Sequence, residues 1–179
     1  MAELLKNPKE MAKAQAELRQ VLEGKVKIHE EDIHELRFFK QIVKETLRLH
    51  LPPGALIPRE SKEECEINGF LIPRKTKAFI NLWAIGRDPR HWRDPQRVNY
   101  MGTNFDYLPF GTGRRMCPGI AFGIITTELQ LATMLYHFNW ELTDGIKPEE
   151  LDMTEAFGLT VKRMHPLNVI ATPSSHCLI

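Results

Sequence analysis

One run of ten residues in the second half of the chain has the residue types and spacing with the clearest chemical meaning. Cys117 in this run precedes a helix-like segment, and backbone N–H groups at a helix N-terminus stabilise a thiolate. The glycines leave room for a flat macrocycle close to the backbone, and the two arginines can pair with its carboxylates. The run therefore predicts a loop in which Cys117 ligates a metal held in such a macrocycle. It reads Phe110-Gly111-Thr112-Gly113-Arg114-Arg115-Met116-Cys117-Pro118-Gly119.

Five positions of this run, Phe110, Gly113, Arg115, Cys117 and Gly119, resemble the F-x-x-G-x-R-x-C-x-G signature of the cytochrome P-450 family. The resemblance implies a haem b cofactor (iron protoporphyrin IX) bound by these residues, with Cys117 as the catalytic axial ligand of the iron. For Cys117 alone, the alternative is a buried structural cysteine after a glycine turn. A cysteine nucleophile with a spatially adjacent histidine is a further alternative, but it leaves the arginines and glycines unexplained.

A second pattern, Glu45-x-x-Arg48, lies upstream and places two opposite charges on one face of a predicted helix. By itself, this pattern describes a solvated surface ion pair of little energetic value. Together with the thiolate loop, residues 44–50 resemble the K-helix of cytochromes P-450. That resemblance implies a buried structural charge cluster of Glu45, Arg48 and a third residue, an arginine from a P-x-R element.

Two alternatives exist for this third arginine. Only residues 96–101 separate Pro95 from Gly102, whereas the family pattern has a longer segment there. Either the segment Pro-Gln-Arg-Val at 95–98 is a degraded form of the element, with Arg97 in the cluster, or the element is deleted. A deletion would cost about 3–5 kcal/mol, because the remaining charges stay buried without compensation.

Further stretches resemble elements of the same family in the same order along the chain. Residues 57–60 (Ile-Pro-Arg-Glu) resemble a strand whose arginine reaches a haem propionate, which implies that Arg59 is also a cofactor-binding residue. An exposed strand arginine is the alternative. Residues 83–89 resemble a stretch of plant-type microsomal members, and residues 52–56 and 157–161 occupy positions that line the substrate pocket in the family.

The resemblance also implies a function and its partners. A plant-type microsomal member of the family is a monooxygenase of secondary metabolism that inserts one oxygen atom from O2 into an apolar small molecule. Its electrons come from NADPH through NADPH-cytochrome reductase, at the cytosolic face of the endoplasmic reticulum membrane. The alternative is a non-catalytic fragment, either inert or interacting with a full-length relative or with the reductase.

The resemblance extends from Ala2 to about Thr172 and corresponds to the C-terminal part of the family fold. The N-terminal membrane anchor and the long central oxygen-activating helix of the family have no counterpart in these residues. We therefore expect residues 1–179 to be the C-terminal haem-binding portion of a P-450 domain, from a truncated gene product, a splice form or a partial record. We also expect that this chain alone does not turn over substrate.

Composition sets the wider limits. The chain has 179 residues, of which 42% are hydrophobic and 26% charged, as in one globular domain. Its net charge of +1 gives no electrostatic argument for a nucleic-acid partner. Its three cysteines are far apart, which argues against a disulfide framework, and neither the histidines nor the cysteines have zinc-site spacing. No stretch reaches the roughly 18 consecutive apolar residues of a membrane span.

The helices that must position these residues are predicted from apolar periodicity. Asn7 and Pro8 mark the start of the first, as N-cap and first-turn proline, and Gly24 ends it. A short acidic helical segment is expected at 30–35 and a helical turn at 83–87. The three long helices are predicted over residues 9–23, 36–50 and 119–138. The buried residues of the first are predicted to be Met11, Leu18, Val21 and Leu22.

Strands are predicted in the middle and at the end of the chain, and residues 88–103 are expected to be irregular. The dipeptide Asn68-Gly69 is a strong hairpin signal between the first two strands. The last two strands are expected to pair with each other. The order predicts a mainly α fold with a small antiparallel β component, which by resemblance is the C-terminal part of the cytochrome P-450 fold. The predicted strands are 64–67, 70–72, 77–82, 159–162 and 167–171.

Overall fold

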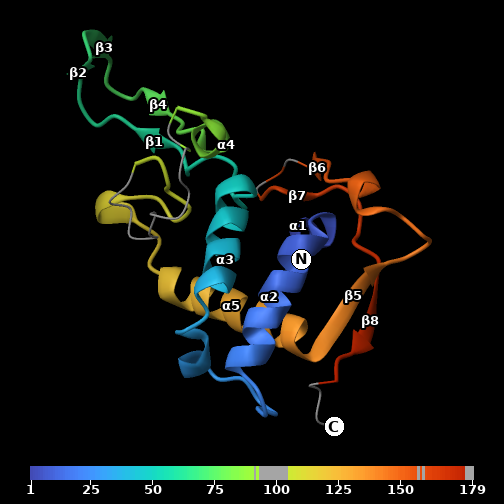
Figure 1. The fold of residues 1–179 in the computed structure, drawn as a ribbon. Coiled ribbons are helices and arrows are strands. Elements are labelled where there is room, and N and C mark those ends of the chain that lie inside the picture. The colour runs from blue at the N-terminus through green and yellow to red at the C-terminus, as the bar shows by residue number, and fades with distance from the viewer. Residues whose placement is uncertain (91, 93–104, 157, 159, 176–179) are drawn as a thin grey trace. The chain divides into compact units, whose positions relative to one another are not determined.

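The computed structural model of the chain describes residues 1–90, 92, 105–156, 158 and 160–175. The chain forms two compact units, and each is described by itself. Unit 1 comprises Met1–Thr46, Cys117–Ala156 and Lys162–Ile179, and unit 2 comprises Leu47–Met116 and Phe157–Val161. Figure 1 traces the elements of each unit along the chain.

Unit 1 is mainly helical, as predicted (Figure 1). The bounds of its three long helices differ from the predicted bounds by at most two residues. The acidic segment forms a short 3₁₀ helix. The helices are α1 (Ala2–Lys6), α2 (Pro8–Val21), most of α3 (Arg37–Leu49), α5 (Ile120–His137) and the 3₁₀ helices η1 (Glu30–Ile33) and η4 (Pro148–Glu150).

The core of unit 1 lies where α2 packs against α5. Ala14 and Leu18, four residues apart on one face of α2, are fully buried, as are Leu135 and Tyr136 of α5. Burial of one such leucine side chain contributes about 1.5–3 kcal/mol to stability. The Tyr136 hydroxyl keeps a partner inside this core, because it donates a hydrogen bond to the Leu22 carbonyl oxygen at 2.8 Å.

Both ends of α2 differ in detail from the prediction. Pro8 lies in the first turn as predicted, but the Asn7 side chain does not cap the helix; its Nδ2 donates to the Glu3 carbonyl oxygen of α1 at 2.8 Å. The prediction that Val21 is buried is wrong, since its side chain is 38% exposed. The reason is that α2 ends at Val21 and the buried face continues through Leu22 instead.

Side chains of α2 also close the C-terminal end of α5, where the carbonyl groups lack donors within the helix. Gln15 Nε2 donates to the Phe138 carbonyl oxygen at 3.0 Å, and Arg19 Nη2 donates to Asn139 Oδ1 at 2.7 Å. These bonds lie where the helix is followed by strand β5 (Phe138–Leu142).

Glu17 of α2 caps the start of α3. Its two carboxylate oxygens accept hydrogen bonds from the backbone N–H groups of Phe38, at 2.9 Å, and Phe39, at 2.8 Å. Such first-turn N–H groups have no partner within the helix, and a carboxylate there also interacts favourably with the helix dipole. Thus α2 fixes the N-terminus of the helix that carries Glu45 and Arg48.

The strands of unit 1 form two antiparallel pairs. β5 pairs with β8 (Val169–Pro173), and β6 (Glu155–Ala156) pairs with β7 (Lys162–Arg163). The predicted strand at 159–162 is wrong for Thr160 and Val161, because β7 begins at Lys162. The prediction that the last two strands pair with each other is also wrong. Their true partners, β5 and β6, follow the long helix, and neither was predicted.

A sequence signal for β5 does exist. Along this strand Phe138, Trp140 and Leu142 are half-buried, while Asn139 and Glu141 between them are exposed. This alternation has the period of a strand. It was missed because the preceding helix was predicted to extend to Phe138, which is the first residue of this strand.

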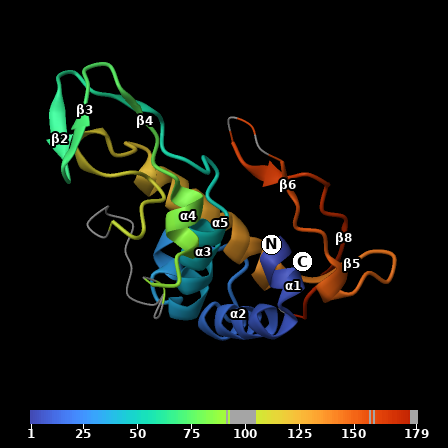
Figure 2. The same cartoon turned by 90° about the horizontal axis from the view of Figure 1, so that it is seen from above.

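Unit 2 contains two further antiparallel strand pairs and a short helix, α4 (Leu82–Arg87). β1 (Arg59–Glu60) pairs with β4 (Lys77–Ala78), and β2 (Cys65–Ile67) pairs with β3 (Phe70–Ile72). Figure 2 shows β2 and β3 side by side. The predicted turn between them is confirmed, with φ of 51° at Asn68 and +81° at Gly69.

The predicted strand at 77–82 is wrong beyond Ala78, because α4 begins at Leu82. Asn81 Oδ1 accepts a hydrogen bond from the Ala84 N–H at 3.0 Å and so caps the helix. Leu82 is buried with Leu51 and Leu108 in the small core of unit 2, and the partly buried Leu56 packs against them.

Glu128 is a buried acidic residue of unit 1, 6% exposed on α5. Burial disfavours the charged form and raises the pKa of this carboxyl group. The positive charges of Lys40, Lys44 and His34 act in the opposite direction, with a smaller effect.

Replacement of Glu128 by glutamine is therefore expected to stabilise the chain, and increasingly so as the pH rises from about 4 to about 7. Below the ordinary value of 4.5 the carboxyl group is neutral in both states. Above it, the unfolded state releases its proton before the folded state does, so the folded state of the wild type loses stability with rising pH. Urea unfolding of both chains at the two pH values measures this difference. An equal difference at both values would contradict the prediction.

A helix that crosses a membrane must be both long and apolar. None of the helices within the described ranges is long and apolar enough to cross a bilayer.

Candidate functional site

The glycine-rich loop leads from unit 2 into α5 of unit 1. Gly111 and Gly113 have φ values of +74° and +72°, a conformation that favours glycine over residues with a Cβ. The Gly111 N–H donates to the Leu108 carbonyl oxygen at 3.1 Å, and a single 3₁₀ turn, η3 (Gly113–Arg115), follows. The glycines thus have a role in the backbone conformation of the loop.

Cys117 lies at the start of the unit 1 part of this loop, shortly before α5. Its thiol is free and exposed. Gly119 is the N-cap of α5, and a Cβ built there would lie 3.9 Å from Cys117 Sγ, an ordinary contact distance. The position of Cys117 before a helix of 18 residues agrees with the sequence expectation, whereas the alternative of a buried structural cysteine does not.

Unit 2 has a hollow of about 950 Å³ on its part of the loop. Arg59 of β1 and Arg114 and Arg115 of the loop all line it, so two distant segments bring their arginines together. The sequence reasoning named these arginines but missed Lys62, which lies three residues after Arg59. The full lining is Leu56, Pro58, Arg59, Glu60, Lys62, Ile80, Thr112, Arg114 and Arg115.

The charge of this hollow suits an anionic ligand. Four of its side chains are cationic and one, Glu60, is anionic. Over the described part of the chain none of the four cations takes part in an ion pair. Leu56 and Ile80 add an apolar wall. A flat apolar group with carboxylates at one edge therefore suits this hollow. In unit 1, the free exposed thiol of Cys117 is a donor for a soft or borderline metal ion.

Arg48 and Glu45 both lie on α3, one helical turn apart. In unit 2 the Arg48 Nη1 donates a hydrogen bond to the Gly86 carbonyl oxygen, and its guanidinium lies over the ring of Trp92, 4.9 Å from the ring centre. Neither partner was predicted from the sequence. Arg97, the candidate third member of the charge cluster, lies outside the described residues.

The two segments expected to line a substrate pocket meet within unit 2. The Val161 N–H donates to the Pro52 carbonyl oxygen, and a Cβ on Gly54 would lie 2.9 Å from a Val161 methyl group. Next to them is a hollow of about 580 Å³ to which Phe79 and Gly158 also contribute. The segments are therefore neighbours, as the resemblance implied.

Among the described residues, no group of three or more His, Cys, Asp or Glu side chains is placed to hold a metal ion.

The comparisons with known proteins all lead to one family. A family model described as Cytochrome P450 matches residues 1–167. Desmethyl-deoxy-podophyllotoxin synthase of Sinopodophyllum hexandrum is 56% identical over 182 residues, which cover 96% of this chain and 36% of that protein. Premnaspirodiene oxygenase of Hyoscyamus muticus is 50% identical over 183 residues, which cover 97% of this chain and 36% of that protein.

The fold gives the same result. A solved structure of a zebra fish cytochrome P450 with abiraterone matches with a TM-score of 0.82 and 25% identity, over 97% of this chain and 42% of that one. The chain thus spans little more than a third of the length of the two plant relatives, and its fold is part of the cytochrome P450 fold. It belongs to the cytochrome P450 family.

Proposed function

We propose that residues 1–179 are the haem-binding portion of a monooxygenase domain and that Cys117 is the axial thiolate ligand of a haem b iron. The observation that carries the proposal is the hollow of unit 2, where Arg59 and Arg115 converge on the loop that continues into Cys117. Arg115 belongs to the family signature, and Arg59 belongs to a family element earlier in the chain. Their convergence comes from the fold.

Different residues of the chain hold different parts of the cofactor. The guanidinium groups of Arg59 and Arg115 pair with the propionates and so fix the orientation of the macrocycle. Cys117 binds the iron as a thiolate, favoured by the N–H groups at the start of α5. Gly113 and Gly119 leave the loop without side chains where the macrocycle approaches, and Phe110 packs near the thiolate.

Bound haem with a thiolate ligand supplies the activation of O2, because the thiolate donates electron density that favours O–O cleavage. Glu45 and Arg48 are structural and hold the loop in place. The hollow next to Val161 and Gly54 receives an apolar small molecule, in keeping with its apolar lining. Electrons come from NADPH through NADPH-cytochrome reductase at the cytosolic face of the endoplasmic reticulum. The printed name of one relative, premnaspirodiene oxygenase, agrees with oxygen insertion.

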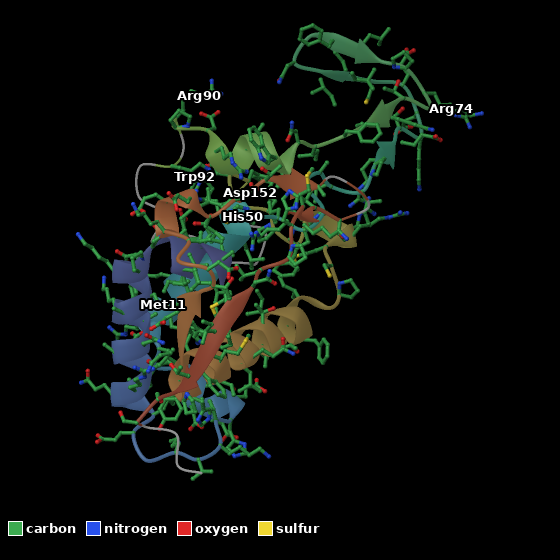
Figure 3. The ribbon with its side chains drawn as sticks, turned by 90° about the vertical axis from the view of Figure 1, so that its right-hand side faces the viewer. Met11, His50, Arg74, Arg90, Trp92 and Asp152 are labelled. Carbon is green, nitrogen blue, oxygen red and sulfur yellow. The ribbon has the colours of Figure 1, made fainter. Side chains whose placement is uncertain are left out.

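A haem titration of the 179-residue chain tests the role of the arginines. Arg115→Leu is expected to weaken haem binding on the order of tenfold, because a charge-assisted hydrogen bond to a propionate is lost. Arg74→Leu is the matched control, since Arg74 is an exposed arginine of unit 2 that does not line the hollow (labelled in Figure 3). Equal weakening by the two variants would contradict the assignment of Arg115.

Turnover is a separate question from haem binding. The test is incubation of the haem-loaded chain with reductase, NADPH and O2. Product that forms with the wild-type chain and not with Cys117→Ala would show that these residues suffice for catalysis. Haem binding without product would leave the cofactor assignment intact and would support the non-catalytic alternative.

A further inference from the structure

Arg48, near the C-terminal end of α3, is held within unit 2 by contacts of two kinds. Its Nη1 donates a hydrogen bond to the Gly86 carbonyl oxygen. Its guanidinium lies over the Trp92 ring, 4.9 Å from the ring centre, within the range of a cation–π interaction. Trp92 itself is fixed to α4, because its Nε1 donates to the Ile85 carbonyl oxygen at 2.8 Å. Figure 3 shows Trp92 close to α4.

These contacts close the end of α4. The carbonyl groups of Ile85 and Gly86 lie in the last turn of a helix of six residues, where donors within the helix run out. Arg48 and Trp92 supply donors to them. The two helices approach so closely that a Cβ on Gly86 would lie 2.5 Å from the Arg48 carbonyl oxygen. The approach therefore depends on glycine at this position.

Trp92 also has contacts on the side of the glycine-rich loop. Its ring meets the ring of Tyr107 edge-on, with centres 6.0 Å apart and an angle of 76°. Tyr107 is 2% exposed and directly precedes Leu108, whose carbonyl oxygen accepts the hydrogen bond from Gly111. A continuous series of contacts thus runs from Arg48 through Trp92 to the first glycine of the loop.

We propose that Trp92 is a positioning residue that holds the Arg48 guanidinium against the Gly86 carbonyl and fixes the start of the glycine-rich loop through Tyr107. Tryptophan is the side chain best suited to this place, because its face attracts a cation more strongly than that of other aromatic residues and its N–H can cap α4. The consequence for haem ligation rests on the proposed function, whereas the hold on Arg48 does not.

The hold on Arg48 is tested without haem, by a double-mutant cycle on the 179-residue chain. Trp92→Leu and Arg48→Met are each expected to raise the unfolding equilibrium constant roughly tenfold. The double variant is expected to fall several-fold short of the product of the two effects, because both remove the same interaction. Effects that simply multiply would overturn the proposal. Arg48→Lys replaces Arg48→Met if that variant does not fold, since lysine keeps the charge without the planar group.

The consequence for the loop is tested on the haem-reconstituted chain by the reduced, carbon-monoxide-bound spectrum. Trp92→Leu is expected to lower the thiolate-ligated share of bound haem several-fold. Trp92→Phe is expected to restore only part of it, because phenylalanine keeps an aromatic face but lacks the N–H. Trp83→Leu is the matched control. The Trp83 ring also has an arginine over it, with Arg87 Cζ 4.4 Å from the ring centre, but Trp83 is 45% exposed. This control is expected to keep the wild-type share.

The two measurements separate the possible failures. If the wild-type chain gives no thiolate band, the proposed function fails and the unfolding cycle still decides whether Trp92 holds Arg48. If the wild-type band is present and Trp92→Leu retains it in full, the role of Trp92 at the loop is overturned and the proposed function stands.

Discussion

Replacement of Cys117 by alanine is expected to abolish the long-wavelength Soret band of the reduced, carbon-monoxide-bound chain after haem reconstitution. This band is characteristic of thiolate ligation, and alanine has no atom that can bind iron. The loss is expected to be complete, whereas haem association through the arginines of unit 2 is expected to persist in part. Absorption spectra of the two reconstituted proteins at equal haem content provide the measurement.

Cys65→Ala is the control for this experiment. Cys65 is also a free, exposed cysteine, but it lies on β2, away from the signature. Its replacement is expected to leave the band unchanged. If the band survives in Cys117→Ala and disappears in Cys65→Ala, the thiolate ligand is Cys65 and the proposed site is refuted.

Replacement of Gly86 by alanine is expected to destabilise unit 2 by about 1–3 kcal/mol, the usual cost of overpacking. From helix propensity alone, alanine would be the better residue here by about 1 kcal/mol. The clash with the Arg48 carbonyl oxygen, 2.5 Å from the new Cβ, reverses the sign, because α4 must move away from the end of α3. The free energy of unfolding, measured by urea denaturation, tests this sign.

Ala84→Gly, in the same helix, is the matched control for Gly86→Ala. Ala84 is exposed, so this exchange reports the propensity of α4 and is expected to cost about 0.5–1 kcal/mol. Gly86→Ala and Ala84→Gly, which are opposite exchanges in one helix, are thus both expected to destabilise the chain. An increase in stability from Gly86→Ala would mean that the two helices do not approach as closely as described.

The sequence predicted those parts of the fold whose signals are local. The long helices follow from apolar periodicity, and the turn at Asn68 and Gly69 follows from two residues that tolerate positive φ. Strand pairing is not local. β8 resembles a strand in the sequence, but its partner β5 lies some thirty residues earlier, and nothing in β8 itself specifies that partner. The nearest strand was therefore chosen, and the choice was wrong.

The candidate site likewise contains parts with a local sequence signal and parts without one. The signature around Cys117 could be recognised because its residues lie within ten positions. Arg59 entered through resemblance to a family element, since no spacing in this chain connects it with Arg115. The neighbours of Arg48 could not be found at all, because a cation–π contact with Trp92 and a bond to the Gly86 carbonyl depend on how separate segments meet. A backbone carbonyl acceptor in particular cannot be predicted from residue types, because every residue has one.

The hydrogen bonds that close the end of α5 also bear on how the chain folds during synthesis. The Tyr136 carbonyl accepts from the Ser174 hydroxyl at 2.9 Å, and the His137 carbonyl accepts from the Ser174 N–H at 2.8 Å. On the ribosome, Leu18 and Leu22 are made before α5, and more than a hundred further residues must be translated before that helix is complete. Until then, the face of α2 that packs against α5 has no α5 to cover it, and the hydrogen bonds from Ser174 can form only later still.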